Sequence, residues 1–172
     1  MDESEQRKRV YAYFGRAMNV AQNLEYTIVS AMVALDFVPR AKGTAGSPEE
    51  AEQRFDAFVK LQLKDTLGTL IKAIRAVTRL PDELAAALDK CNRKRNWLAH
   101  HFFRERADAF MTEQGRAQMV VELRQVHDLF TSTLETFERT MQPAWDRLGV
   151  TEEHVQGFTD NYIRQLRDDA GK

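Results

Sequence analysis

Apolar residues recur at every third or fourth position along most of the chain, which is the spacing of one face of an α-helix. The first such segment covers about residues 4 to 36, a long helix for a globular protein. Its apolar stripe consists of Val10, Phe14, Ala17, Ala21, Leu24, Ile28, Ala31 and Leu35. Tyr11, Tyr13 and Met18 make a second face partly apolar, so we expect that face either to enter the core or to meet a partner.

Glycine and proline divide the rest of the chain into further helices. Residues 37–50, "FVPRAKGTAGSPEE", have the composition of a loop. Within them, Ser47 followed by Pro48 and Glu50 predicts the start of a second helix. This helix should extend to about residue 79, and its apolar stripe shifts near residues 64–68, where a kink would fall.

Two more long helices and a short one follow. A third helix starts at Leu80-Pro81-Asp82, and a fourth extends to Pro143, which ends or bends it. A short last helix is predicted over about residues 151–168. No segment alternates apolar and polar residues as a strand would. The predicted fold class is therefore all-α, an up-and-down helical bundle of four to five helices.

Composition fits one globular domain. The chain has 172 residues, of which 43% are apolar, enough for a single core that we place in about residues 5–142. Its net charge of -1 gives no support to a general attraction to nucleic acid or membranes, so any electrostatic site must be local. One cysteine, Cys91, excludes an internal disulfide and fits a reducing compartment. The charged N-terminus leads into no signal-like segment, and the most apolar run, residues 27–35, is too short to span a bilayer. We therefore expect a cytoplasmic protein.

The third helix carries an arginine inside its apolar stripe. With about 100° per residue, Arg95 lies in the middle of a stripe formed by Leu84, Leu88, Cys91, Leu98 and Phe102. A guanidinium stays charged, and burying it without acceptors costs several kcal/mol. Arg95 should therefore pair with a carboxylate, reach an interface or receive an anion. The carboxylates considered for a structural salt bridge are Asp56, Asp65 and Glu122.

Other polar and basic residues surround Arg95. Asn96 and His100 are four positions apart on one edge of the helix, where their side chains can interact. Residues 90–106 contain six Lys or Arg and one Glu, a local positive charge in a neutral chain. This composition is typical of a phosphate site. The candidate RNA- or phosphate-binding residues are Arg93, Lys94, His101 and Arg104.

Arg95 and His100 lie about 140° apart on an ideal helix. One straight helix therefore does not direct both side chains at one atom. Three arrangements would: the arginine curls around the helix, the helix loosens near Ala99, or two copies of the motif meet across a two-fold axis.

The stretch Arg95-Asn96-Trp97-Leu98-Ala99-His100 resembles the R-x4-6-H signature of the HEPN superfamily, in which a polar residue often follows the arginine. The resemblance covers about residues 5–142. It implies an HEPN-like α-helical fold and a homodimer in which the two motifs face each other. It further implies a metal-independent endoribonuclease, with a role as a toxin, in defence or in RNA processing. Carried over by position, Arg95 would polarise the scissile phosphate, His100 would transfer a proton, and Asn96 would orient one of the reacting groups.

These residue types suit the implied reaction. A histidine titrates near neutral pH and can act as a general acid or base. A fixed guanidinium stabilises charge that develops on phosphoryl oxygens. No cluster of residues at metal-ligand spacing occurs in the sequence, and we expect no metal and no cofactor.

The resemblance has one departure. HEPN toxins paired with a nucleotidyltransferase antitoxin often continue as H-x-Y, and the tyrosine receives AMP. Here the sequence is His100-His101-Phe102, and phenylalanine has no hydroxyl to modify. We therefore do not expect control of this kind, although a different antitoxin or regulatory protein stays among the expected partners.

Structural roles compete with these assignments. Arg95 would then form a buried salt bridge, His100 would interact with the helix dipole, and Asn96 would make a polar contact between helices. His127 reads as a core or interface histidine and Cys91 as a small core residue. For the whole protein, the alternative functions are a non-catalytic HEPN-like dimerisation module that binds RNA, a nucleotide or a protein, and an unrelated helical bundle.

Overall fold

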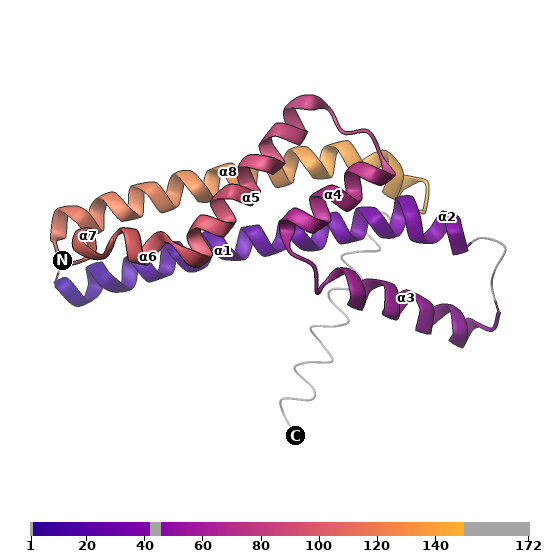
Figure 1. Ribbon diagram of the computed structural model, residues 1–172, viewed down its shortest axis with the longest axis horizontal. Coiled ribbons are helices and arrows are strands. Elements are labelled where there is room, and N and C mark those ends of the chain that lie inside the picture. The colour runs from indigo at the N-terminus through magenta and orange to yellow at the C-terminus, as the bar shows by residue number, and fades with distance from the viewer. Residues whose placement is uncertain (1, 42–45, 150–172) are drawn as a thin grey trace, which may run out of the picture.

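The computed structural model describes residues 2–41 and 46–149, and this part of the chain is all-α, with no strand (Figure 1). The elements are α1 (Glu3–Met32), a π-helical turn η1 (Val33–Phe37), α2 (Val38–Ala41), α3 (Pro48–Gln62), α4 (Leu67–Val77), α5 (Asp82–His100), α6 (Phe102–Glu105), α7 (Ala107–Phe110) and α8 (Glu113–Asp146). The predicted all-α class is confirmed. The short helix predicted over residues 151–168 lies outside the described residues.

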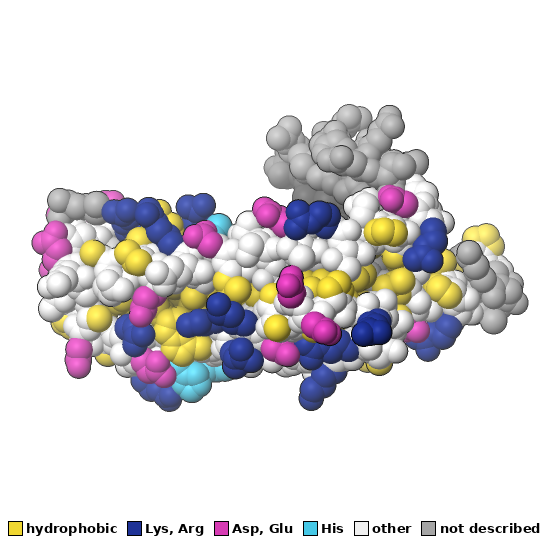
Figure 2. Space-filling model, turned by 90° about the horizontal axis from the view of Figure 1, so that it is seen from above, with side chains coloured by type: hydrophobic (Ala, Val, Ile, Leu, Met, Phe, Trp, Pro, Cys, Tyr) yellow, Lys and Arg dark blue, Asp and Glu magenta, His cyan; other side chains and the backbone are white. Residues whose placement is uncertain are grey.

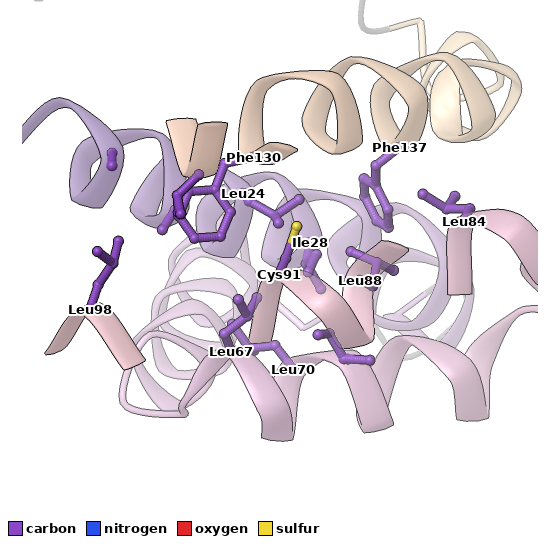
Figure 3. Packing of buried hydrophobic residues seen from close by; sticks show 14 of the residues in the cluster. Leu24, Ile28, Leu67, Leu70, Leu84, Leu88, Cys91, Leu98, Phe130 and Phe137 are labelled. Atoms are coloured by element: carbon purple, nitrogen blue, oxygen red, sulfur yellow. The ribbon is translucent and has the colours of Figure 1, made fainter. Parts of the chain in front are cut away.

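The two longest helices, α1 and α8, run side by side in the same direction along the length of the molecule (Figure 1). Hydrogen bonds from Arg116 to Gln6 and from Arg124 to Tyr13 fix their parallel register. Helices α4 and α5 pack against this pair. Apolar side chains from all four helices point toward one another in Figure 3, among them Leu24, Ile28, Leu67, Leu70, Leu84, Leu88, Cys91, Leu98, Phe130 and Phe137. The predicted helical stripes thus form one core.

The first helical region is longer than the sequence predicts. The loop expected from residue 37 is wrong at its start, because α1 continues through η1 into α2. The N–H group of Val38 bonds to the carbonyl of Val33, five positions earlier. Pro39 follows and has no N–H to give, and the wider turn lets the helix pass it.

The predicted start of the second helix is confirmed, and the predicted kink is a full break. The Ser47 hydroxyl accepts a hydrogen bond from the N–H of Glu50 at 3.3 Å. Helix α3 then ends at Gln62, and Thr66 caps α4 by accepting from the N–H of Thr69. Helix α3 contains no buried residue. The second predicted helix is therefore two helices: α4 contributes fully buried residues, whereas Phe58 and Val59 of α3 pack only at the edge of the core.

No helix in the described part of the chain combines the length and the apolar composition that crossing a membrane requires.

Candidate functional site

Arg95 faces the interior of the bundle and pairs with a carboxylate. Its Nε lies 3.3 Å from Oε1 of Glu25 on α1, and the two side chains are 25% and 18% exposed. The structural salt bridge considered from the sequence is therefore present, but with a different partner. Of the three carboxylates considered, Asp56 lies on the exposed helix α3 and Asp65 between α3 and α4, and neither pairs with Arg95.

The third carboxylate considered, Glu122, binds another arginine. It accepts two hydrogen bonds from Arg106, at 2.8 Å from Nε and 2.9 Å from the second guanidinium nitrogen. This bidentate geometry is the strong form of an arginine–carboxylate pair. It raises the pKa of Arg106 further above its ordinary value, with the hydrogen bond to Glu122 as the main cause.

The Arg95–Glu25 pair is weaker in geometry. Oε1 of Glu25 is buried, and no group in the described residues makes a well-aligned hydrogen bond to it. Burial raises the pKa of the Glu25 carboxyl, and the charge of Arg95 offsets this rise only in part. Arg95 is thus held by an ion pair without good hydrogen-bond alignment, whereas Arg106 is held by two hydrogen bonds.

Asn96 and His100 are exposed, in contrast to Arg95. Neither side chain makes a hydrogen bond within the described residues, so Asn96 is not the polar contact between helices that the structural alternative required. His100 is the last residue of α5, where its interaction with the helix dipole stays a prediction. Both side chains are accessible to a ligand.

Arg95 and His100 do not converge on one atom within this chain. They are five residues apart, about 7.5 Å along the axis of α5. Arg95 contacts α1, whereas His100 faces solvent. The α-helix continues through Ala99 to His100, so the loosening considered near Ala99 is absent. Of the three arrangements, a change in the Arg95 side chain and a pairing of two copies are compatible with this geometry.

The chain turns sharply directly after His100. His101 interrupts the helix with φ -129° and ψ -30°, and α6 begins at Phe102. Phe102 is completely buried, with its ring 5.1 Å from Trp97 and 5.9 Å from Phe14. This anchor fixes the direction in which α5 ends, and with it the position of His100.

The predicted phosphate-binding residues lie around this turn. Arg93 and Arg104 are exposed, and Lys94 and His101 are half-buried. A guanidinium nitrogen of Arg104 lies 2.5 Å from Nδ1 of His101. Because arginine can only donate, Nδ1 is the acceptor, and a neutral His101 carries its proton on Nε2. His101 is thereby a partner of Arg104.

Beside the turn, a hollow of about 320 Å³ lies between α5 and α8. We call it the Trp97 hollow, and its lining consists of Lys90, Lys94, Trp97, Arg106, Glu122, Gln125, Val126 and Leu129. The Lys94 ammonium lies 4.7 Å and the Arg106 guanidinium carbon 5.6 Å from the centre of a Trp97 ring. In Figure 2, Lys, Arg and His side chains gather around apolar surface at the end of the molecule where α6 and α7 lie. Cations and an aromatic ring thus share one accessible surface.

Two features of the structure were not predicted from the sequence. The first is Glu25. It lies four residues after Ala21 and three before Ile28, a spacing that places it at the edge of the first apolar stripe. The second is a group of arginines around Tyr13. Arg9, Tyr13 and Arg16 are four and three positions apart, a spacing that places them on one face of α1. Tyr13 itself is half-buried.

Two further reactive side chains, Cys91 and His127, make contacts away from the end of α5. Cys91 is buried as predicted, and its thiol donates to the Thr133 hydroxyl at 3.4 Å. His127 is half-buried, with Nδ1 at 3.3 Å from Asp128. No three His, Cys, Asp or Glu side chains come together at a metal-binding distance in residues 2–41 and 46–149.

No protein-family model matches the chain, and no curated protein or solved structure matches it either. The features that bear on function are therefore the geometry of α5 and its surroundings.

Proposed function

We propose that this protein is an HEPN-type, metal-independent endoribonuclease that acts as a homodimer in the cytoplasm. The observation that carries the proposal is the pair of accessible side chains at the end of α5. Asn96 and His100 are exposed and have no hydrogen-bonding partner in the described residues. They lie in a basic segment of a chain whose net charge is -1. A polyanionic substrate suits such a surface.

The proposed reaction is cleavage next to a 2'-hydroxyl. Neutral His100 of one copy takes the proton of the 2'-hydroxyl while the 2'-oxygen forms a bond to phosphorus. The bond from phosphorus to the 5'-oxygen breaks, and a water molecule gives that oxygen a proton; the hydroxide left behind then takes the proton from His100. The products carry a 2',3'-cyclic phosphate and a 5'-hydroxyl. Asn96 orients the reacting groups, and Arg93, Lys94, His101 and Arg104 bind neighbouring phosphates.

Arg95 would stabilise charge on the phosphoryl oxygens. The poorly aligned ion pair with Glu25 and the 25% exposed side chain of Arg95 support an exchange of the carboxylate for a phosphate. The five-residue separation from His100 supports a site in which the two residues come from different copies. The toxin or defence role, and any regulatory protein that silences the enzyme, rest on the resemblance of the motif.

The experiment compares wild type with Arg95→Ala and His100→Ala on end-labelled RNA of mixed sequence in EDTA. The matched control is His127→Gln, which changes a histidine on α8 next to Asp128. We expect cleavage by wild type and by the control, and loss of cleavage in the two motif variants at unchanged helicity and oligomeric mass. Cleavage that persists in His100→Ala, or that ends in a 3'-phosphate without a cyclic form, would contradict the mechanism.

A second candidate is a non-catalytic HEPN-like module that binds RNA. The observation in its favour is the Arg95–Glu25 contact, in which the proposed catalytic arginine pairs with a carboxylate of the same chain and not with a substrate. Such a module would bind RNA without turnover, and Arg95→Ala would leave its affinity unchanged. The same set of variants distinguishes the two candidates when affinity is measured beside cleavage.

A further inference from the structure

Three exposed arginines, two on α1 and one on α8, surround the ring of one tyrosine. The guanidinium carbons of Arg9, Arg16 and Arg124 lie 5.9, 5.5 and 4.8 Å from the centre of the Tyr13 ring. Arg124 also donates a hydrogen bond of 2.6 Å to the Tyr13 hydroxyl. We call these four residues the Tyr13 arginine cluster. Guanidinium groups pack well against aromatic rings, so Tyr13 serves as their common support.

The positive charge of this cluster is not neutralised. No carboxylate in the described residues lies within ion-pair distance of Arg9, Arg16 or Arg124, whereas nearby Arg7 pairs with Glu3 at 2.5 Å. The hydrogen bond from Arg124, together with the charges of Arg124 and Arg9, lowers the pKa of Tyr13. Three like charges on one ring repel each other, so an anion that bridges them would be stabilised.

The cluster adjoins a hollow of about 290 Å³. Its lining consists of Gln6, Arg9, Glu113, Arg116, Ala117, Val120, Val121 and Arg124. Arg116 is 5% exposed and is fixed by hydrogen bonds of 2.9 Å to Gln6 and to the carbonyl of Phe110. A buried arginine fixed by hydrogen bonds therefore lies beside the exposed arginines of the cluster. The nearby acidic residues Glu3 and Glu113 are the first residues of α1 and α8 and lie at that end of the two helices.

This surface is distinct from the one at the end of α5. Arg124 lines the hollow beside Tyr13, and Glu122 lines the Trp97 hollow. Glu122 and Arg124 are two positions apart on α8, a separation of about 200° around the helix axis. The two hollows therefore open on different sides of α8, and they share no lining residue.

We propose that the Tyr13 arginine cluster binds successive backbone phosphates of an RNA strand. The inference rests on the proposed function, which makes RNA the ligand. Arg9 and Arg16 are seven residues apart, about 10 Å along α1. The cations are thus spread along α1 and across to α8, and they suit a chain of phosphates better than one phosphate group. Guanidinium groups recognise phosphate by paired hydrogen bonds, without reading the base.

The test measures the affinity of the full chain for a labelled single-stranded 2'-O-methyl RNA of mixed sequence. This probe lacks the attacking hydroxyl, so binding is measured without cleavage. Wild type is compared with Arg16→Gln, Arg124→Gln and the double variant by fluorescence anisotropy, over about 50 to 200 mM salt. The control is Arg139→Gln, which removes one charge from an exposed position of α8 fifteen residues beyond Arg124.

We expect each cluster variant to weaken binding roughly tenfold and to lower the slope of log affinity against log salt by about 0.7, the value for one contact with a single strand. The double variant should lose about twice that slope. Because these arginines are exposed, the variants should keep the helicity of wild type. Equal affinity and slope in wild type, cluster variants and control would overturn the inference, as would a wild type that does not bind the probe.

Failure of this inference is distinguishable from failure of the proposed function. If cleavage depends on His100 but the RNA affinity is unchanged by substitution of Arg16 and Arg124, only the proposed role of the cluster is refuted. Binding that depends on the two arginines in a protein that does not cleave supports the cluster and refutes only the catalytic proposal.

Discussion

The ion pair of Arg95 and Glu25 allows a sharp test of the site, because neutralising Arg95 and neutralising Glu25 should lower the free energy of unfolding by different amounts. The perturbations are Arg95→Gln, Glu25→Gln and the double variant. Arg95→Gln leaves the Glu25 carboxylate ionised without its partner. This side chain is 18% exposed, and burial already raises its pKa. Glu25→Gln leaves a long side chain that is 25% exposed and can extend its charge toward water.

The magnitude follows from the partial burial. Exposed ion pairs contribute about 0.2 to 1 kcal/mol, and breaking a buried pair costs about 3 to 5 kcal/mol. With side chains 18 to 25% exposed, the pair lies between these limits. We expect Arg95→Gln to lower the free energy of unfolding by about 2 kcal/mol and Glu25→Gln by about 1 kcal/mol. In the cleavage assay, Glu25→Gln should remain active, because it leaves Arg95 charged and released.

The pH dependence has a definite sign. The folded-state pKa of Glu25 is raised above its ordinary value of 4.5. Its ionised form therefore opposes folding, a penalty that is absent below that ordinary value and complete above the folded-state pKa. Arg95→Gln increases this penalty, so its loss of stability should shrink when the protein is acidified from about pH 7 toward pH 4.5.

The assay is urea unfolding followed by circular dichroism at both pH values. The double variant is the control, because it has no carboxylate at position 25 and should lose this pH dependence. A deficit for Arg95→Gln that does not change with pH, or a larger deficit for Glu25→Gln than for Arg95→Gln, would refute the reasoning.

Two further predictions concern the support of the site. Phe102→Ala should lower the free energy of unfolding by about 3 to 5 kcal/mol, because the ring is completely buried against Trp97 and Phe14; thermal unfolding checks this, and a loss below about 1 kcal/mol would contradict the packing. The Cys91 thiol should react with a disulfide reagent only as fast as the protein opens, because burial raises its pKa and hides its sulfur. Complete reaction of the native protein on mixing would contradict that burial.

Local sequence signals predicted most of the helical fold. The stripe spacing located the long helices, and Ser47 located the start of α3, because both depend on residues within a few positions of each other. The continuation of the first helix past Pro39 was not predictable in this way. It is supported by contacts of Phe37 with Phe55 and Phe58 at 5.8 and 5.1 Å, which require α3 to fold back onto η1.

The candidate site was predictable only on α5 itself. The helical wheel correctly separated Arg95 from Asn96 and His100. It did not identify Glu25, because periodicity tells which face of a helix is buried but not which helix covers that face. The Tyr13 arginine cluster was missed for the same reason, since Arg124 joins Arg9 and Arg16 only when α1 and α8 align in parallel.

The outward direction of His100 and the inward direction of Arg95 bear on how a dimeric site would be assembled. If each site takes Arg95 from one copy and His100 from the other, a mixed dimer of Arg95→Gln and His100→Ala contains one site with both defects and one intact site. Random mixing makes half of the dimers mixed, so the mixture should recover about a quarter of wild-type cleavage, although each variant alone is inactive. If Arg95 and His100 of the same copy act together, every site in every dimer is defective and nothing is recovered. Mixing after unfolding and refolding, with each variant refolded alone as the control, separates these assemblies. Full inactivity of a mixture shown by mass to contain mixed dimers would exclude the composite site.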